Sequence, residues 1–284
     1  MKGGFLKKSP MNPETEVIRP AHSLDKVAII TGGNKGIGLG CAKVFVADGY
    51  SVTICGRDSA VGERVAIDLT AKGPGKCHFE KCDVRKRDDI ERLIHTTIEM
   101  FGQLNCLINN AGIHPPFKTI DEFSVEEFHA LLEMNLISYF TACKLALPYL
   151  RKTHGSIINI GSLTSILGDY GTTIYCSTKA AINGFTKALA IEEARNGVRV
   201  NAVIPGNIIT QSRQDLEATM RNGQAFHDFV ESWQWLGRSG TIEESGYTCL
   251  FLASDGAGFI TGTELILSGG AELGFGPKRP MPEF

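Results

Sequence analysis

Four polar residues have the types and spacing needed to move a proton to or from an alcohol. Tyr175 and Lys179 lie four residues apart at the start of a predicted helix, so their side chains share one face of it. Ser162 follows a predicted strand that precedes this helix, and Asn135 lies in the helical segment before that strand. A tyrosine, with a reference pKa of about 10, can act as a base near neutral pH only if its phenolate is stabilised.

The chemistry predicted for these residues is hydride transfer between an alcohol carbon and a nicotinamide ring. Tyr175 would be the general acid/base, the Lys179 ammonium would stabilise its phenolate, and Ser162 would hold the substrate oxygen as it becomes a carbonyl. Asn135 could hold a water that links Lys179 to solvent. Taken alone, the tyrosine could be a core residue, the lysine a surface residue and the serine a loop residue. The prediction therefore depends on the order of these residues in the chain and on a glycine loop nearer the N-terminus.

This glycine loop lies between the first predicted strand and the first predicted helix. Gly32, Gly36 and Gly38 allow a tight turn in which backbone N–H groups and the helix N-terminus can meet a pyrophosphate. The spacing, T-G-x-x-x-G-x-G, differs from the usual G-x-G-x-x-G, and a plain strand-to-helix turn is the alternative. Between a strand and a helix, the pattern favours a dinucleotide cofactor.

The end of the second predicted strand favours NADP(H). An acidic residue there accepts hydrogen bonds from the ribose hydroxyls and favours NAD, whereas a basic residue accommodates the 2′-phosphate of NADP. This sequence has Gly56 in the acidic position, Arg57 next to it, and Lys35 in the glycine loop. We therefore expect NADP(H), with NAD(H) as the alternative if the two cations are only solvated surface residues.

Short segments rich in Val, Ile and Cys alternate with amphipathic segments from Asp25 to Leu267. Several are apolar at successive positions, which is typical of strands buried on both faces of a parallel sheet. The sequence predicts an α/β fold, a single doubly wound Rossmann-type domain with a seven-stranded parallel sheet and helices on both faces. The expected strands are 26–31, 51–55, 77–82, 104–109, 156–160, 198–203 and 264–267, and the expected helices are 37–48, 59–72, 87–101, 124–151, 175–196 and 242–253.

The length of 284 residues fits one open α/β domain. We expect residues 25–270 to form it, residues 1–24 to be a loose N-terminal extension, and residues 271–284 to be a tail that can reach a neighbouring subunit. Residues 206–240 follow the sixth strand and are the expected substrate lid, with a rigid helical hairpin as the alternative.

Composition argues against several classes of function. A net charge of −2 leaves no basic excess for nucleic acid or anionic lipid, and the mean hydropathy of −0.02 with only short apolar runs argues against a membrane span. The N-terminus has no apolar run of signal-peptide length, although an organellar presequence remains an alternative. The eight cysteines include no C-x-x-C, which favours buried free thiols over a disulfide or metal framework. We expect a cytoplasmic protein with a small-molecule substrate and no metal.

At these residues the sequence resembles the classical short-chain dehydrogenase/reductase family, over roughly residues 24–270. The resemblance implies that Asp83 and Val84 bracket the adenine, that Asn110 steadies the central strand and the cofactor ribose, and that Thr210 meets the cofactor amide or pyrophosphate. The complete set of expected cofactor-binding residues is Gly32, Asn34, Lys35, Gly36, Ile37, Gly38, Arg57, Asp83, Val84, Asn110, Ala111, Gly112, Tyr175, Lys179, Pro205, Gly206, Ile208 and Thr210.

Segments 113–116, 145–152, 205–208 and 269–276 resemble the steroid and sugar dehydrogenases of this family. That resemblance implies a 17β-hydroxysteroid or related secondary alcohol as substrate. The alternatives are an L-fucose-type sugar dehydrogenase or a catalytically silent nucleotide-binding scaffold. The expected substrate-binding residues are His114, Ser162, Asn207 and Ile209.

The family resemblance also implies a homotetramer. Two-fold symmetry is the commonest way to close such an assembly. The helix of Tyr175 presents small residues along its length, which would let a second helix approach closely. They are Ala180, Ala181, Gly184 and Ala188, with Leu189 beside them.

Overall fold

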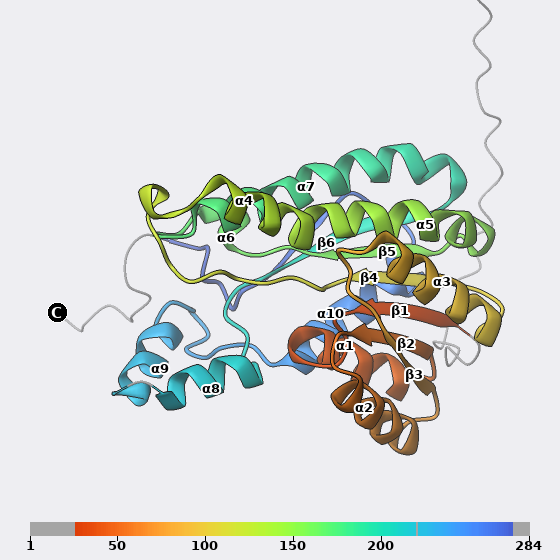
Figure 1. Cartoon of the computed structure of the whole chain (residues 1–284), viewed down its shortest axis with the longest axis horizontal. Coiled ribbons are helices and arrows are strands. Elements are labelled where there is room, and N and C mark those ends of the chain that lie inside the picture. The colour runs from red at the N-terminus through yellow and green to blue at the C-terminus, as the bar shows by residue number, and fades with distance from the viewer. Residues whose placement is uncertain (1–25, 220, 275–284) are drawn as a thin grey trace, which may run out of the picture.

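The computed structural model describes residues 26–219 and 221–274 as a parallel sheet between two layers of helices (Figure 1). Seven strands pair in parallel in the order β3-β2-β1-β4-β5-β6-β7, so the strand order reverses between β1 and β4. This confirms the predicted doubly wound, seven-stranded fold. The strands are β1 (Val27–Thr31), β2 (Ser51–Gly56), β3 (Lys76–Lys81), β4 (Cys106–Asn109), β5 (Ser156–Ile160), β6 (Arg199–Pro205) and β7 (Glu264–Leu267).

The central strands are buried on both faces because they are apolar at successive positions. Every residue of β1, β4 and β5 is buried, whereas the edge strands β3 and β7 keep exposed or half-buried positions. All eight cysteines are free thiols, and six of them are buried.

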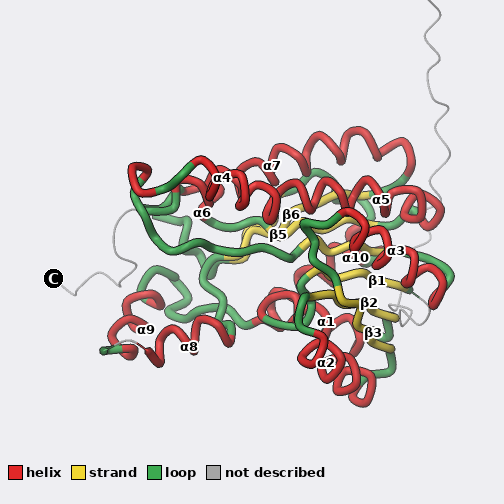
Figure 2. Tube along the Cα trace, viewed as in Figure 1, coloured by secondary structure: helices red, strands yellow, loops and turns green. Residues whose placement is uncertain are grey.

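Helices cover both faces of this sheet (Figure 2). Two apolar clusters, one on each face, hold the helices to the strands. One layer contains α1 (Gly36–Ala47), α2 (Ser59–Lys72) and α10 (Ile242–Ala253), and the other contains α3 (Arg87–Phe101), α5 (Ser138–Thr153) and α7 (Thr173–Glu193). The shorter helices are α4 (Val125–Leu132), α6 (Thr164–Leu167), α8 (Gln211–Thr219) and α9 (Gly223–Glu231).

The segment 124–151 is helical as predicted, but it is not one regular α-helix. A π turn, Glu133–Ile137, separates α4 from α5, because one additional residue is accommodated there. By length and composition, the helical segment Val125–Thr153 could cross a membrane, but half of its most apolar 18-residue stretch is buried inside the protein. Its apolar side packs on the sheet together with α3, as expected of a helix within an α/β domain.

The segment predicted to be a lid contains α8 and α9, which pack on each other beyond the carboxyl ends of the strands (Figure 1). Its two ends are tied together, since Gly240 N donates to Asn207 O at 2.9 Å and Ile209 N donates to Gly240 O at 2.8 Å. Opening and closing of this segment stays a prediction. The expected N-terminal extension and residues 275–284 of the expected tail lie outside the described residues.

A stability prediction follows from the crossing of α1 and α10. A Cβ at Gly40 would lie 1.9 Å from Ile242 O, so Gly40→Ala must push two backbones apart. We expect it to lower the free energy of unfolding by about 1–3 kcal/mol in urea denaturation. The matched control is Gly184→Ala, where a Cβ meets nothing within 4 Å; it should gain up to about 1 kcal/mol. Equal stabilities for the two variants would contradict the close crossing.

Candidate active site

The four residues predicted to carry proton transfer come together at the carboxyl edge of the sheet. Tyr175 and Lys179 lie in the first turns of α7, Ser162 follows β5, and Asn135 lies in the π turn. Lys179 Nζ is 5.9 Å from the centroid of the Tyr175 ring. Asn135 Oδ1 and Lys179 Nζ both approach Gly112, at 3.1 and 3.7 Å from where its Cβ would be. A side chain at residue 112 would therefore intrude between these two groups.

Lys179 is held as a buried cation beside β5. The residue is 4% exposed, and its Nζ donates a hydrogen bond to Ile160 O at 2.9 Å. Burial lowers its pKa to about 8, so the ammonium predominates at neutral pH. A fixed positive charge therefore lies next to the Tyr175 ring.

Tyr175 holds its proton more firmly than a free tyrosine. Burial raises its pKa, and the Ser162 hydroxyl opposes this only in part. The protonated phenol is the form needed of a general acid, which protonates a carbonyl oxygen during reduction. To act as the base in oxidation, Tyr175 needs further positive charge beside it, which the ring of an oxidised nicotinamide would supply.

The π turn directs Asn135 into the site. This residue is fully buried; its Oδ1 accepts from Ile113 N and its Nδ2 donates to Ile113 O, both at 3.0 Å. Nδ2 also donates to the Thr178 hydroxyl at 3.2 Å. Asn135 thus fixes the backbone just after Gly112, while its role in holding a water stays a prediction.

Sequence reasoning missed two threonines that orient the site. The Thr164 hydroxyl donates to Ser162 Oγ at 2.9 Å, and Thr164 N approaches the same oxygen at 3.3 Å. Thr178 is the hydroxyl partner of Asn135. The only sequence signal was their closeness to Ser162 and Lys179, and a threonine so placed has many other uses.

Of the expected substrate-binding residues, His114 lies nearest to the tyrosine. Its ring centroid is 4.3 Å from that of Tyr175, and its Nδ1 donates to Pro115 O at 2.6 Å. The Asn207 amide instead donates to Gln234 Oε1 at 2.9 Å, across the base of the segment that carries α8 and α9. Ile209 is half-buried in the same region. Contact of these residues with a substrate stays a prediction.

The glycine loop has the shape that a pyrophosphate requires. Gly32 and Gly36 have φ of 65° and 55°, a conformation that favours glycine. A Cβ at Gly38 would lie 2.4 Å from Gly32 O, so the start of α1 can approach the loop only without a side chain. Helix α1 has no side-chain cap, and Ile37 lies in its first turn. The backbone N–H groups there fit a bound phosphate.

The turn after β4 supports this loop. Asn110 Nδ2 donates to Thr31 O at 2.8 Å, and the N–H groups of Asn110 and Ala111 donate to the Thr31 hydroxyl at 2.9 and 3.0 Å. The predicted role of Asn110 in steadying the central strands thus has a geometric basis.

The expected adenine corner is preorganised around an ionised carboxylate. Arg85 Nε donates to Asp83 Oδ1 at 2.9 Å, and this partner lowers the pKa of Asp83 to about 2. The neighbouring Val84 is 7% exposed and packs in the core. Sequence reasoning missed Arg85, because a charged residue after a strand is common on protein surfaces.

The expected ribose corner has no acid at position 56 and two exposed cations, one of which, Arg57, is close enough to Asp83 to help lower the pKa of its carboxyl. A Cβ at Gly56 would lie 2.7 Å from Asn34 Oδ1, so the asparagine fills the space that an acidic side chain would need. Arg57 and Lys35 are exposed, and in the part of the chain that the structure describes neither side chain forms a hydrogen bond or ion pair. Exposed cations can contact a phosphate, and the preference for NADP(H) over NAD(H) stays a prediction.

The chain after β6 passes close to the glycine loop. Pro205 ends the strand, Gly206 packs against Ser268, and Ile208 is buried. The Thr210 methyl carbon is 3.7 Å from where a Cβ of Gly36 would be. Thr210 is thus placed to meet a cofactor lying on the loop.

Known proteins share this arrangement over most of the chain. The family model described as enoyl-(acyl carrier protein) reductase matches residues 32–272. The L-fucose dehydrogenase of Bos taurus is 45% identical over 253 residues, 89% of this chain and 92% of that protein. The 3-oxoacyl-[acyl-carrier-protein] reductase of Chlamydia muridarum is 35% identical and is covered over 97% of its length, with 87% of this chain.

A solved structure gives the same result in three dimensions. The crystal structure of Cj0485 dehydrogenase matches with a TM-score of 0.81 and 33% identity, over 87% of this chain and 94% of that one. Family model, relatives and solved structure all cover the segments that carry the glycine loop and the residues around Tyr175. The chain therefore belongs to the short-chain dehydrogenase/reductase family of NAD(P)-dependent oxidoreductases.

Proposed function

We propose that this enzyme is an NADP(H)-dependent dehydrogenase that oxidises a CH–OH carbon of an L-fucose-type sugar. The similarity to L-fucose dehydrogenases carries the choice of substrate. The sequence had favoured a 17β-hydroxysteroid and kept the sugar as the alternative; the relatives support the sugar better. The position of His114, with its ring centroid 4.3 Å from that of Tyr175, also suits a polyhydroxylated substrate, because an imidazole can hydrogen-bond to hydroxyls.

The residues of the site divide the work of oxidation. Ser162 donates a hydrogen bond to the substrate oxygen, and Tyr175, once it has lost its own proton to solvent and become a phenolate, takes the hydroxyl proton while the carbon gives up a hydride. Bound NADP⁺ would accept that hydride and supply positive charge. The Lys179 ammonium stabilises the negative charge of the phenolate. Asn135 fixes the backbone that follows Gly112 through its two bonds to Ile113.

The first test of this function is Tyr175→Phe, which keeps the ring and removes the proton carrier. Turnover of L-fucose should fall by roughly 10²- to 10⁴-fold, with cofactor affinity nearly intact. The measurement is steady-state kinetics with L-fucose, other aldoses and a 17β-hydroxysteroid. Tyr170→Phe is the control, since Tyr170 is 82% exposed, and it should keep full activity. Faster turnover of the steroid than of every aldose would reject the sugar assignment but not the role of Tyr175.

The second test concerns the cofactor. Arg57→Gln removes a charge-assisted contact to the 2′-phosphate, worth about 1.5–3 kcal/mol, and should lower kcat/KM for NADP by roughly 10- to 150-fold. Gly56→Asp should swing the NADP/NAD ratio of kcat/KM further towards NAD, although the new carboxylate must displace the Asn34 amide. Arg64→Gln, an exposed arginine on α2, is the matched control and should leave the ratio unchanged. A wild-type preference for NAD would overturn the proposal.

We further propose a cytoplasmic homotetramer. In one protomer, Ala180, Gly184 and Ala188 lie exposed along α7, and the exposed Phe140 of α5 contacts Phe185 beside them. An exposed aromatic next to small residues favours close helix packing against a second copy.

The assembly test places a large charge on that face. Gly184→Arg has room in one protomer, where nothing lies within 4 Å of the new Cβ, so it should fold and yet fail to assemble. Sedimentation should show the 30.8 kDa protomer or a dimer for this variant and four times the protomer mass for wild type. Gly184→Ala should stay tetrameric. A monomeric wild type at micromolar concentration would disprove the assembly.

A further inference from the structure

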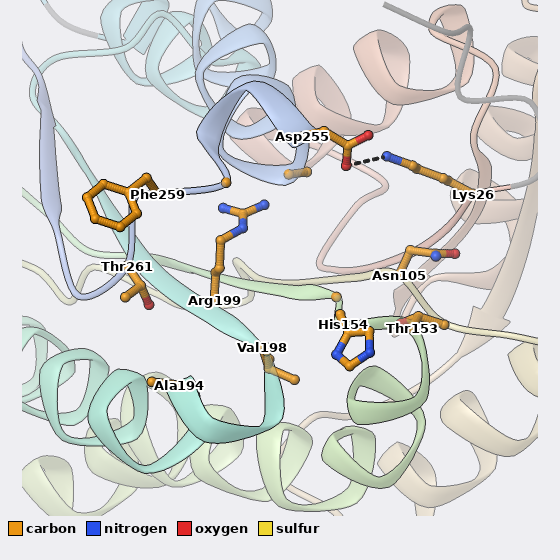
Figure 3. A pocket seen from close by; sticks show the side chains of 14 residues that line it. Lys26, Asn105, Thr153, His154, Ala194, Val198, Arg199, Asp255, Phe259 and Thr261 are labelled. Atoms are coloured by element: carbon orange, nitrogen blue, oxygen red, sulfur yellow. Dashed lines mark hydrogen bonds and ion pairs between the residues drawn. The ribbon is translucent and has the colours of Figure 1, made fainter. Parts of the chain in front are cut away.

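A half-open cavity of about 580 Å³ lies at the amino edge of the sheet, the edge opposite the candidate active site (Figure 3). Its walls come from the segments that lead into five strands: Lys26 before β1, Asn105 before β4, His154 before β5, Arg199 at the start of β6, and Phe259 before β7. The volume is in the range of small-molecule sites. The proposed reaction uses none of these residues.

Arg199 brings a partly buried positive charge into this cavity. Its guanidinium donates to Leu252 O at 2.6 Å and to Ser254 O at 3.2 Å, at the C-terminal end of α10. These bonds fix the group in place through backbone carbonyls, not through a carboxylate. None of the ion pairs among residues 26–219 and 221–274 involves Arg199. Burial lowers the pKa of this guanidinium, and the charge of Asp255, which is beyond ion-pair distance, offsets that effect only in part. A partly buried cation with no carboxylate directly bonded to it is unusual.

The other walls are also suited to an anion. Asp255 is the carboxylate nearest to these cations, but it is paired with Lys26 at 3.2 Å and is itself 96% exposed. The lining therefore carries two permanent cations against one carboxylate. His154 Nδ1 donates to Asn196 O at 3.0 Å, which fixes the ring at the wall of the cavity.

Phe259 gives the cavity an apolar side. The ring is fully exposed and lies at the rim of the cavity, on the same side as Arg199 (Figure 3). A large exposed aromatic at the rim of a cavity that also contains a fixed cation offers a flat anionic ligand both an apolar and a charged contact.

We propose that this cavity is a second ligand site, which binds a small organic anion through Arg199 and Lys26 and holds its flat apolar part against Phe259. The site is separate from the reaction, so its failure would leave the proposed function intact. Its position at the starts of the strands puts the bound anion roughly 15–20 Å from the catalytic edge, the length of a five- or six-residue strand.

The probe is benzoate, with benzyl alcohol as its uncharged counterpart, titrated into the full-length enzyme at concentrations on the order of millimolar. Methyl NMR resonances of Val198 and Ala253, which line the cavity, should shift with benzoate and not with benzyl alcohol. The methyl of Ala111 at the catalytic edge should shift less. Equal responses to both probes, or none to benzoate, would overturn the proposal.

Substitutions of the lining residues test whether benzoate binds in this cavity. Lys26→Gln and Phe259→Ala alter exposed or half-exposed groups, so both should fold, and each should weaken benzoate binding several-fold. Arg199→Gln should weaken it at least tenfold. Lys43→Gln removes an exposed ion pair outside the cavity and should change nothing. Unchanged affinity in both Lys26→Gln and Phe259→Ala would disprove the site even if Arg199→Gln fails to fold.

Discussion

A single threonine hydroxyl joins β1 to the turn after β4, at the point in the sheet where the order of the strands reverses. Thr31 Oγ1 accepts the N–H groups of both Asn110 and Ala111, while the Asn110 amide returns a bond to Thr31 O. Because the chain leaves these two paired strands towards opposite faces of the sheet, a crevice opens at their carboxyl ends, and the strands must be joined there without filling it. Small residues on both sides, Gly32 and Gly112, leave that crevice open. The glycine loop and the site around Tyr175 therefore share one rigid foundation.

Helix geometry places the polar side chains of the site and their charges. Asn135 reaches Ile113 because a π turn rotates it inward, and Lys179 reaches Ile160 because α7 begins just ahead of it. Burial shifts the pKa values of the Lys179 ammonium and the Tyr175 phenol in opposite directions, because it disfavours the charged form of each group. Burial lowers the pKa of Lys179 and raises that of Tyr175, so the pair alone keeps the phenol protonated. Ionisation of Tyr175 would therefore need further positive charge beside it, which a bound oxidised nicotinamide would supply.

Much of this architecture could be predicted from local pattern. Runs such as 27–30 are apolar at every position, which is typical of a parallel strand covered on both faces, and their alternation with helical segments then favours a doubly wound sheet. The residues at the strand ends had to meet at one edge, because parallel strands all point the same way. The π turn was missed because residues 124–151 keep a helical period on both sides of it, and one inserted residue hardly alters that pattern.

The sequence by itself determined the fold, the catalytic residue types and the absence of an acid at Gly56, since each depends on residues close together in the chain. Only the tertiary structure decided which partners those residues meet. Asn34 fills the space beside Gly56, Gln234 takes the Asn207 amide, and Arg85 holds Asp83 ionised. It also placed Arg199 and Phe259 around one cavity, although they are 60 positions apart in the chain. Such contacts depend on how loops from different strands pack, and loop packing leaves no periodic trace in a sequence.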